Sequence, residues 1–347
     1  MTSAQPAPSL TALLARLVAR QDLSRDETRA LLDAVFDDRI EPALLGAMLA
    51  ALGTKGESVD ELVGAAEAMR ARVTAVRTPP GTHAIDTCGT GGDGQPLLNI
   101  STAVAIVCAA AGATVAKHGN RSNTRPSGSA EVLAELGVNV DADVPVLERC
   151  LREVRIAFLY APRLHPAMKH AAAVRRALGV RTIFNLVGPL TNPAGVRRQV
   201  LGVSRPELVP TMLEALRQLG AERALVVHGL DGLCDLTIGA PSRVGWWDGQ
   251  GTRVEEFDPQ SIGVPRASLD ALQVRSPAES AASILAVLTG QRGPGRDVVE
   301  LNAAAALWVA GLAADWQEGR AHAARAIDTG AADATLRAWA TVSHASG

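Results

Sequence analysis

Four glycines within six residues, Gly89 to Gly94, constrain the fold of this chain more than any other feature. They follow a short segment of extended character, His83 to Thr87, and precede the small apolar run Ala103 to Ala111, long enough for a helix. Glycines in such a turn let the backbone approach a phosphate and direct N–H groups toward it, and the following helix N-terminus favours the anion. The loop therefore predicts a site for a phosphorylated ligand, although a strand-to-helix turn without any ligand would have the same composition.

Length, charge and cysteine usage limit the class of protein. With 347 residues, the chain exceeds the usual domain size of about 100 to 200, which favours two domains or one domain with an appendage. A formal charge of −2 with scattered cations gives no electrostatic footprint for nucleic acid or an anionic membrane. Four widely spaced cysteines indicate neither a zinc ribbon nor a disulfide framework, and no apolar run approaches the roughly 20 residues of a membrane helix. We expect a cytoplasmic protein.

The first eighty residues have the pattern of helices only. Apolar residues recur at helical spacing from Leu10 to Val18, and Pro42 is placed to open another helix. Ser24 with Glu27, and Ser58 with Glu61, have the spacing of capping boxes before the apolar runs Leu31 to Phe36 and Leu62 to Met69. The segment therefore predicts a small helical domain.

After Thr78-Pro79-Pro80-Gly81, short β-branched segments alternate with helical ones. Besides the extended segment before the glycine loop, strands are expected at 114–117, 138–140, 156–159 and 224–227. This alternation predicts a mainly parallel sheet flanked by helices. Because ligands bind beyond the carboxyl ends of parallel strands, the loops that follow these strands are the candidate site.

A second polar loop, Lys117 to Glu131, follows the strand at 114–117. Its cations, amides and hydroxyls can bond to phosphate oxygens and sugar hydroxyls, and either Ser127 or Ser129 is expected to cap the next helix. A solvated surface loop would explain the polarity, but it would not explain why two such loops end neighbouring strands.

Two further segments carry candidate binding residues. Arg175 lies on an expected helix before the stiff Gly188-Pro189 turn, and an arginine there can grip a planar carboxylate, although a solvated surface charge is the common alternative. Asp235, with Asp231 nearby, follows the strand at 224–227. Magnesium in proteins often uses one or two carboxylates plus substrate phosphates, whereas an Asp-Gly turn is the structural alternative here.

Taken together, these segments resemble the anthranilate phosphoribosyltransferase family, which shares its fold with the pyrimidine nucleoside phosphorylases. The resemblance covers nearly the whole chain in order, and its motifs are Gly89-Thr90-Gly91-Gly92-Asp93, Asn99-Ile100-Ser101-Thr102, Lys117 to Ser122, Gly128-Ser129-Ala130, His165 to Met168, Arg181 to Pro193 and Leu301 to Ala305. It implies an α/β domain with a mainly parallel central sheet, residues 79–164 and 191–347, hinged to a small all-α domain, residues 1–78 with 165–190 packing onto it. It also implies a homodimer formed through the helical domain.

The resemblance further implies a reaction: the amine of anthranilate attacks C1 of phosphoribosyl diphosphate, giving N-(5-phosphoribosyl)anthranilate and diphosphate, the second step of tryptophan biosynthesis from chorismate. The residues implied to bind phosphoribosyl diphosphate are Gly89, Gly91, Gly92, Asp93, Asn99, Ser101, Thr102, Lys117 and Ser129. Those implied to bind anthranilate are Gly89, His118, Asn120, Arg175, Gly188 and Pro189. Mg²⁺ is the implied cofactor, with Ser101 and Asp235 as ligands. Orientation by Arg175 and Asn120 replaces acid or base catalysis.

The chain departs from the family pattern at a few positions. Cys234-Asp235 stands where an Asp-Glu pair is usual, and cysteine is a poor ligand for a hard cation. Thr124-Arg125-Pro126 replaces two serines and a basic residue, and Glu131 replaces Asp. We therefore expect weaker binding of magnesium and diphosphate than is typical.

Two other functions remain open on sequence grounds. A nucleoside phosphorylase on the same fold would also bind phosphate and a ribosyl group, but it would not need Arg175 beside Gly188-Pro189. A non-catalytic paralogue with a weakened magnesium site, such as a nucleic-acid binder, is suggested by Cys234, whereas the intact glycine loop and the missing basic patch oppose it.

Overall fold

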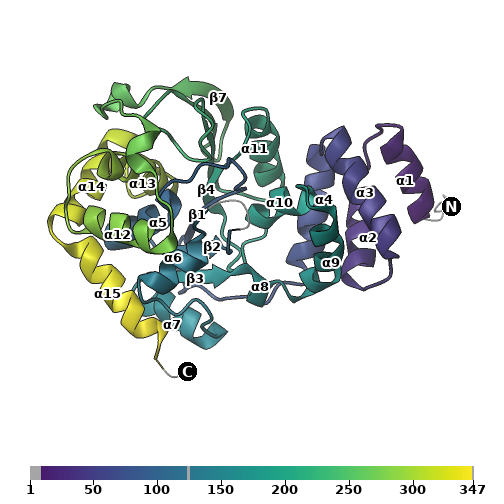
Figure 1. The fold of residues 1–347 in the computed structure, drawn as a ribbon, viewed down its shortest axis with the longest axis horizontal. Coiled ribbons are helices and arrows are strands. Elements are labelled where there is room, and N and C mark those ends of the chain that lie inside the picture. The colour runs from purple at the N-terminus through teal and green to yellow at the C-terminus, as the bar shows by residue number, and fades with distance from the viewer. Residues whose placement is uncertain (1–8, 123–125, 346–347) are drawn as a thin grey trace. The chain divides into compact units, whose positions relative to one another are not determined.

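The computed structural model describes residues 9–122 and 126–345 (Figure 1). The chain divides into two compact units. The helical unit is Met1–Thr74 with Leu164–Thr191, and the sheet unit is Ala75–Arg163 with Asn192–Gly347.

The helical unit is built from two separate stretches of the chain. Its described elements are α1 (Leu10–Val18), α2 (Arg25–Phe36), α3 (Pro42–Lys55), α4 (Val59–Arg70), η1 (Pro166–Met168), α9 (Lys169–Leu178), α10 (Ile183–Val187) and η2 (Gly188–Leu190). Both predicted capping boxes are confirmed. The hydroxyl groups of Ser24 and Ser58 each accept a hydrogen bond from the N–H three residues later, and the backbone N–H of each serine donates to the glutamate carboxylate at that position. Gly64 lets α4 approach α2, since a methyl group there would lie 2.2 Å from the Arg25 carbonyl oxygen.

The sheet unit contains a sheet with the strand order β3-β2-β1-β4-β5-β6-β7. Its strands are β1 (Ile85–Gly89), β2 (Val115–Gly119), β3 (Ile156–Tyr160), β4 (Arg198–Gly202), β5 (Arg223–Gly229), β6 (Ser242–Trp247) and β7 (Thr252–Phe257). The first five run parallel, whereas β6 and β7 continue the sheet antiparallel. The predicted mainly parallel α/β architecture with a small helical unit is confirmed. As predicted, the two polar loops follow the neighbouring strands β1 and β2.

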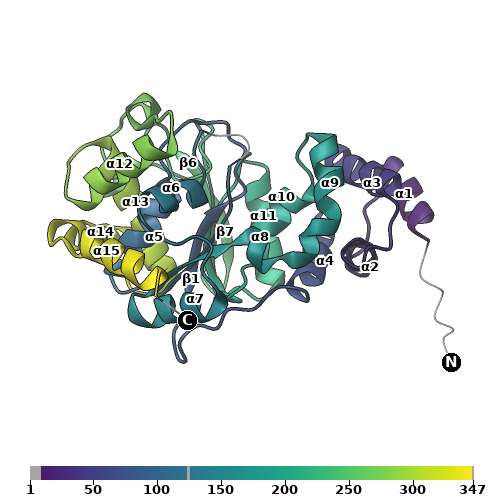
Figure 2. The ribbon, with the colours of Figure 1, turned by 60° about the horizontal axis from the view of Figure 1, so that its bottom comes forward.

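Helices cover both faces of this sheet. In the described part of the unit they are α5 (Ile100–Ala110), α6 (Ser129–Glu135), α7 (Val144–Glu153), α8 (Ala161–Leu164), α11 (Leu208–Gln218), η3 (Pro259–Ile262), η4 (Leu269–Leu272), α12 (Pro277–Leu288), α13 (Pro294–Ala310), α14 (Trp316–Asp328) and α15 (Ala331–Ser343). Figure 2 shows α5 and α13 on one face of the sheet and α11 on the other. Both α5 and α13 are almost entirely buried and carry small apolar side chains. Among the described helices, none combines the length and hydropathy that a membrane span requires.

Two local expectations are wrong. Residues 138–140 form no strand, because the N–H of Asn139 bonds to the Ser343 hydroxyl (2.9 Å) near the end of α15 instead of to a neighbouring strand. Neither Ser127 nor Ser129 caps α6: Gly128 occupies the cap position and Ser129 is already the first helical residue. Strands β4, β6 and β7 were not predicted at all; β7 is almost wholly exposed, so it lacks the alternation of buried and exposed residues that marks a strand.

Candidate active site

The glycine-rich loop leaves β1 at its carboxyl end. Its start is fixed to the next strand, because the Thr90 N–H donates to the Gly202 carbonyl (2.8 Å). Gly91, Gly92 and Gly94 adopt φ values of +59°, +83° and +67°, a region in which other residues are strained. The loop therefore needs glycine for its backbone path, and it leads directly to the N-terminus of α5, whose cap residue Asn99 makes no side-chain bond to the helix.

Asp93 ties the glycine loop to the loop that follows β5. One carboxylate oxygen accepts a hydrogen bond from the N–H of Gln95 (3.2 Å), and the other accepts from the N–H of Cys234 (3.1 Å). The loop after β5 also packs closely on β4, since a methyl group on Gly202 would lie only 1.6 Å from the Cys234 carbonyl oxygen. The glycine-rich loop, the end of β4 and the loop after β5 are thus fixed to one another at the carboxyl edge of the sheet.

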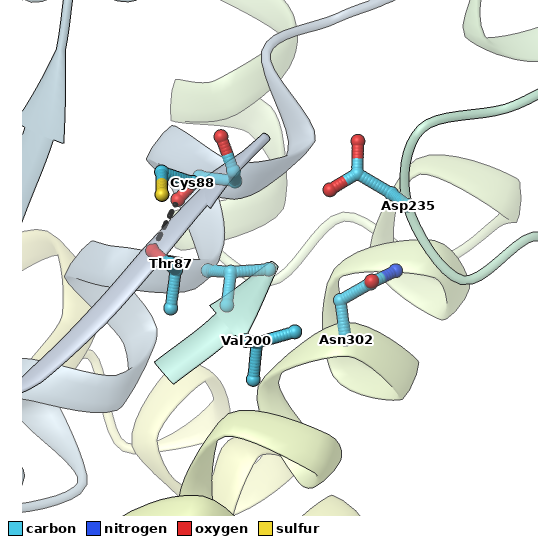
Figure 3. Close-up of a pocket in the computed structure, with 7 residues that line it drawn as sticks. Thr87, Cys88, Val200, Asp235 and Asn302 are labelled. Atoms are coloured by element: carbon cyan, nitrogen blue, oxygen red, sulfur yellow. Dashed lines mark hydrogen bonds between the residues drawn. The ribbon is translucent and has the colours of Figure 1, made fainter. Parts of the chain in front are cut away.

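A small pocket opens beside these contacts (Figure 3). Its walls come from β1, α5, β4, the loop after β5 and α13, through Thr87, Cys88, Ser101, Val104, Val200, Asp235 and Asn302. The structure therefore brings together Ser101 and Asp235, the two residues that the resemblance implied as magnesium ligands. The Asp235 carboxylate points toward the end of β1 in this view.

Lys117 lies beneath the pocket and is almost fully buried, with 1% of its surface exposed. Its ammonium group donates to the Thr87 carbonyl (2.7 Å) and to the Ser101 hydroxyl (3.1 Å). Burial lowers the pKa of Lys117, and the nearby carboxylate of Asp86 opposes this shift. The lysine thus contacts two of the residues that line the pocket, Thr87 and Ser101.

Asp86 positions the start of the second polar loop. It is fully buried and accepts hydrogen bonds from the N–H of His118 (3.1 Å) and from the side-chain amide of Asn192 (2.8 Å). Asn192 donates in turn to the Ala116 carbonyl (2.8 Å). These contacts fix the backbone of β2 at the predicted binding residues Lys117 and His118.

Asn99 connects the two polar loops. Its side-chain oxygen accepts hydrogen bonds from the hydroxyl groups of Ser127 and Ser280. In the second loop, the Ser129 hydroxyl donates to the Asn120 carbonyl (3.1 Å), while the exposed Asn120 side chain accepts from the N–H of Arg121 (2.7 Å). The Thr124-Arg125 part of the loop lies outside the described residues.

Two residues singled out in the sequence, Thr102 and Cys234, are buried. Thr102 is fully buried in the first turn of α5, and its hydroxyl has no hydrogen-bond partner among the described residues. Cys234 is also buried, and its thiol donates a weak hydrogen bond to the Gly91 carbonyl with an S···O distance of 3.8 Å.

Asp231 stabilises its own turn by accepting a hydrogen bond from the Thr237 hydroxyl (2.6 Å), which agrees with the Asp-Gly turn.

The remaining predicted acceptor residues lie in the helical unit. The Arg175 guanidinium on α9 stacks over the ring of Phe184, 5.2 Å from the ring centre. No carboxylate pairs with Arg175 in the described part of the chain, and burial lowers its pKa. Gly188 and the buried Pro189 form the start of η2, and a methyl group on Gly188 would meet no atom within 4 Å. His118 and Asn120 belong to the sheet unit, so the predicted acceptor residues are divided between the two units.

Sequence reasoning assigned no role to Asn302, which lines the pocket from α13. Its signal was present in the sequence as the polar member of the run Leu301-Asn302-Ala303-Ala304-Ala305, which the structure buries in full. A buried amide inside an alanine-rich helix needs partners, and it was therefore a candidate for contacts with another segment.

Comparisons with known proteins agree with this architecture. Residues 81–333 match the glycosyl transferase family α/β domain, and residues 11–73 match the helical bundle domain of the same family. Anthranilate phosphoribosyltransferase from Moorella thermoacetica is 48% identical over 329 residues, covering 95% of this chain and 97% of the relative. The enzyme of that name from Nitrosomonas europaea is 42% identical over 333 residues, covering 96% and 98%.

Solved structures of anthranilate phosphoribosyltransferases also match this chain over nearly its whole length. The crystal structure of anthranilate phosphoribosyltransferase from Thermus thermophilus matches with a TM-score of 0.89 at 39% identity, covering 96% of this chain and 99% of that one. The Saccharomyces cerevisiae enzyme, in complex with phosphoribosyl diphosphate (PRPP) and Mg, matches with a TM-score of 0.87 at 25% identity, covering 96% and 97%. The chain belongs to the anthranilate phosphoribosyltransferases.

Proposed function

We propose that this protein transfers the 5-phosphoribosyl group of PRPP to the amine of anthranilate, giving N-(5-phosphoribosyl)anthranilate and diphosphate in tryptophan biosynthesis. Membership of the family supports this reaction, and the names of the relatives state it. The observation that carries the proposal is the pocket at the carboxyl end of β1, which is lined by both Ser101 and Asp235.

On the donor side, the proposed diphosphate site consists of the glycine loop and the N-terminal turn of α5. Gly89, Gly91 and Gly92 leave the backbone open to a diphosphate, and the helix end favours its negative charge. Lys117 adds a buried cation below the pocket, held by the Thr87 carbonyl at 2.7 Å. Asn99, Thr102 and Ser129 complete the proposed set around the phosphoribosyl group.

The residues present fit Mg²⁺ bound together with diphosphate. Asp235 and Ser101 offer oxygen atoms to one pocket, which are the donors that Mg²⁺ prefers. No group of three or more His, Cys, Asp or Glu side chains in the described residues could hold a metal. Because the Lys117 ammonium lies 3.1 Å from the Ser101 hydroxyl, a second cation there needs the negative charge of the substrate. When bound, magnesium would stabilise negative charge on the departing diphosphate.

On the acceptor side, Arg175 is the proposed partner of the anthranilate carboxylate. Its guanidinium has no carboxylate partner in the described part of the chain and lies over the ring of Phe184. An aromatic amine is uncharged at neutral pH, so it needs orientation more than deprotonation. Its nitrogen forms the bond to C1 as the C1–O bond to diphosphate breaks; the electron pair leaves with the diphosphate, and the nitrogen then releases a proton.

We further propose that the chain has two domains. The helical domain is residues 1–78 with 165–190, and the PRPP-binding domain is residues 79–164 with 191–347. Closure of the hinge between the two domains would exclude water from the active site. The division into two contact units supports this proposal. We also propose a homodimer formed through the helical domain, which a measurement of the molar mass in solution tests. A cytoplasmic location is part of the same proposal.

The loss of anthranilate fluorescence tests the proposed reaction. We expect anthranilate to be consumed only when both PRPP and Mg²⁺ are present, with release of one diphosphate per anthranilate. Phosphorolysis of thymidine without consumption of anthranilate would instead show a nucleoside phosphorylase. Salt-dependent DNA binding without any turnover would show a non-catalytic paralogue.

A further inference from the structure

Asp235 lies in a segment that has no regular secondary structure of its own. Residues 230–241, between β5 and β6, contain neither helix nor strand. A carboxylate that binds a ligand from such a loop needs its backbone fixed by neighbouring residues, because small displacements weaken binding. The contacts of residues 234–236 therefore decide whether Asp235 is held in place.

Asn302 provides the most complete of these contacts. Its side-chain oxygen accepts a hydrogen bond from the N–H of Leu236 (3.0 Å), and its amide nitrogen donates to the carbonyl of the same residue (2.9 Å). The second amide proton is donated to the Val298 carbonyl (2.9 Å) within α13. The Asn302 amide thus pairs with the backbone of Leu236 much as a neighbouring strand would.

The surroundings of Asn302 are apolar, so its buried amide depends on this pairing. The side chain is 4% exposed, and the residues that follow it, Ala303 to Leu307, are fully buried and apolar. An unpaired amide here would cost about 1 to 3 kcal/mol, so a polar residue is stable in this helix only with its partners in place. Figure 3 shows Asn302 on α13 beside the segment that carries Asp235, and both side chains line the same pocket.

We propose that Asn302 is a positioning residue that holds the Asp235 carboxylate in the site for magnesium and diphosphate. The inference rests on the proposed function of the pocket. Asn302 acts through the backbone of Leu236, so its loss should weaken binding of PRPP with magnesium and leave the acceptor unaffected. The contact of Asp93 with the Cys234 N–H holds the other side of Asp235 and should preserve part of the site.

The test is a calorimetric titration of PRPP, with and without Mg²⁺, into wild type and Asn302→Ala. We expect the affinity for PRPP in the presence of Mg²⁺ to fall about 10- to 100-fold, the range found for residues that orient metal ligands. The KM for anthranilate should stay unchanged, and higher Mg²⁺ concentrations should restore much of kcat. Asn302→Asp keeps an acceptor for the Leu236 N–H, so its affinity for PRPP with Mg²⁺ should lie between those of wild type and Asn302→Ala. This variant replaces Asn302→Ala in the test if the alanine variant does not fold.

Ser343→Ala is the matched control. The Ser343 hydroxyl is 2% exposed and accepts a hydrogen bond from a loop N–H, that of Asn139, in the same unit but away from the pocket. We expect this variant to lose stability without any change in magnesium dependence.

A purely structural role would overturn the inference: Asn302→Ala would then unfold more easily but bind PRPP and Mg²⁺ like wild type. Wild-type affinity of Asn302→Asp for PRPP and Mg²⁺, together with easier unfolding, would also show a purely structural role. Failure of the proposed function would look different, because wild type itself would neither bind PRPP with Mg²⁺ nor consume anthranilate.

Discussion

The two regions that the proposed reaction requires are built in different ways. On the donor side, in the sheet unit, the polar residues already bond to one another, as Lys117 does with Ser101 and Asp93 does with the Cys234 N–H. On the acceptor side, in the helical unit, Arg175 contacts the ring of Phe184 and has no anionic partner in the described residues. The proposed donor region is organised by internal hydrogen bonds, whereas Arg175, in the proposed acceptor region, has no anionic partner among the described residues.

The difference has an energetic consequence. Donor-side substitutions break internal hydrogen bonds, so they should reduce both stability and binding. Acceptor-side substitutions mainly remove the proposed contacts with the ligand, so they should reduce binding more than stability, although Arg175→Ala also removes the contact with Phe184.

The largest effect is expected for Asp235→Asn. The substitution removes the carboxylate that we propose as a magnesium ligand. The apparent Mg²⁺ affinity should therefore fall by more than about 100-fold, which is a larger loss than substitution of a residue that only orients a ligand should cause. The Mg²⁺ dependence of anthranilate consumption measures this. An unchanged Mg²⁺ midpoint would remove Asp235 from the metal site.

Arg175→Ala should have the next largest effect. Loss of a charge-assisted hydrogen bond worth about 1.5 to 3 kcal/mol corresponds to a rise of about 10- to 100-fold in the KM for anthranilate. The KM for PRPP should stay close to the wild-type value. Its exposed neighbour on α9 provides the control: Arg176→Ala should change neither constant. Equal effects of Arg175→Ala on both substrates would place Arg175 outside the acceptor site.

A smaller effect is expected for Gly188→Ala. Gly188 has a φ of −47°, and a methyl group would meet no protein atom, so the free energy of unfolding should stay the same or rise by up to about 1 kcal/mol. If anthranilate packs on Gly188, the methyl group occupies part of its space, and the KM for anthranilate should rise about tenfold. Kinetics and chemical unfolding of one preparation measure both quantities. A normal KM would show that the acceptor does not contact Gly188.

The smallest effect at neutral pH concerns His165, in the helical unit. Burial lowers its pKa from 6.5 to about 4, so between these values the unfolded chain binds more protons than the folded one. Stability should therefore fall as the pH drops from 6.5 toward 4, by about 2 kcal/mol at pH 5. His165→Gln should flatten this slope. Identical slopes for wild type and His165→Gln would contradict the assignment.

Features set by local chemistry were predictable from sequence. The capping boxes at Ser24 and Ser58 depend on residues three positions apart, and the glycine loop depends on backbone angles that few other residues adopt. The family resemblance named Ser101 and Asp235, which the structure places around one pocket. The role of each residue toward a ligand stays a prediction.

Features set by distant contacts were missed. The partner of Asn302 is 66 residues away at Leu236, and Asn99 bonds to Ser280 across 181 residues. No periodicity or spacing identifies such pairs. The error at 138–140 has the same origin, because the Ser343 hydroxyl takes the N–H that a neighbouring strand would have used.

Calorimetric titration of PRPP and Mg²⁺ into wild type, Asp235→Asn and Arg175→Ala tests the division into donor and acceptor regions most directly. We predict that Arg175→Ala binds PRPP with an affinity close to that of wild type, and that Asp235→Asn loses most of the Mg²⁺-dependent affinity. Equal weakening by both substitutions, or full affinity in Asp235→Asn, would contradict this division.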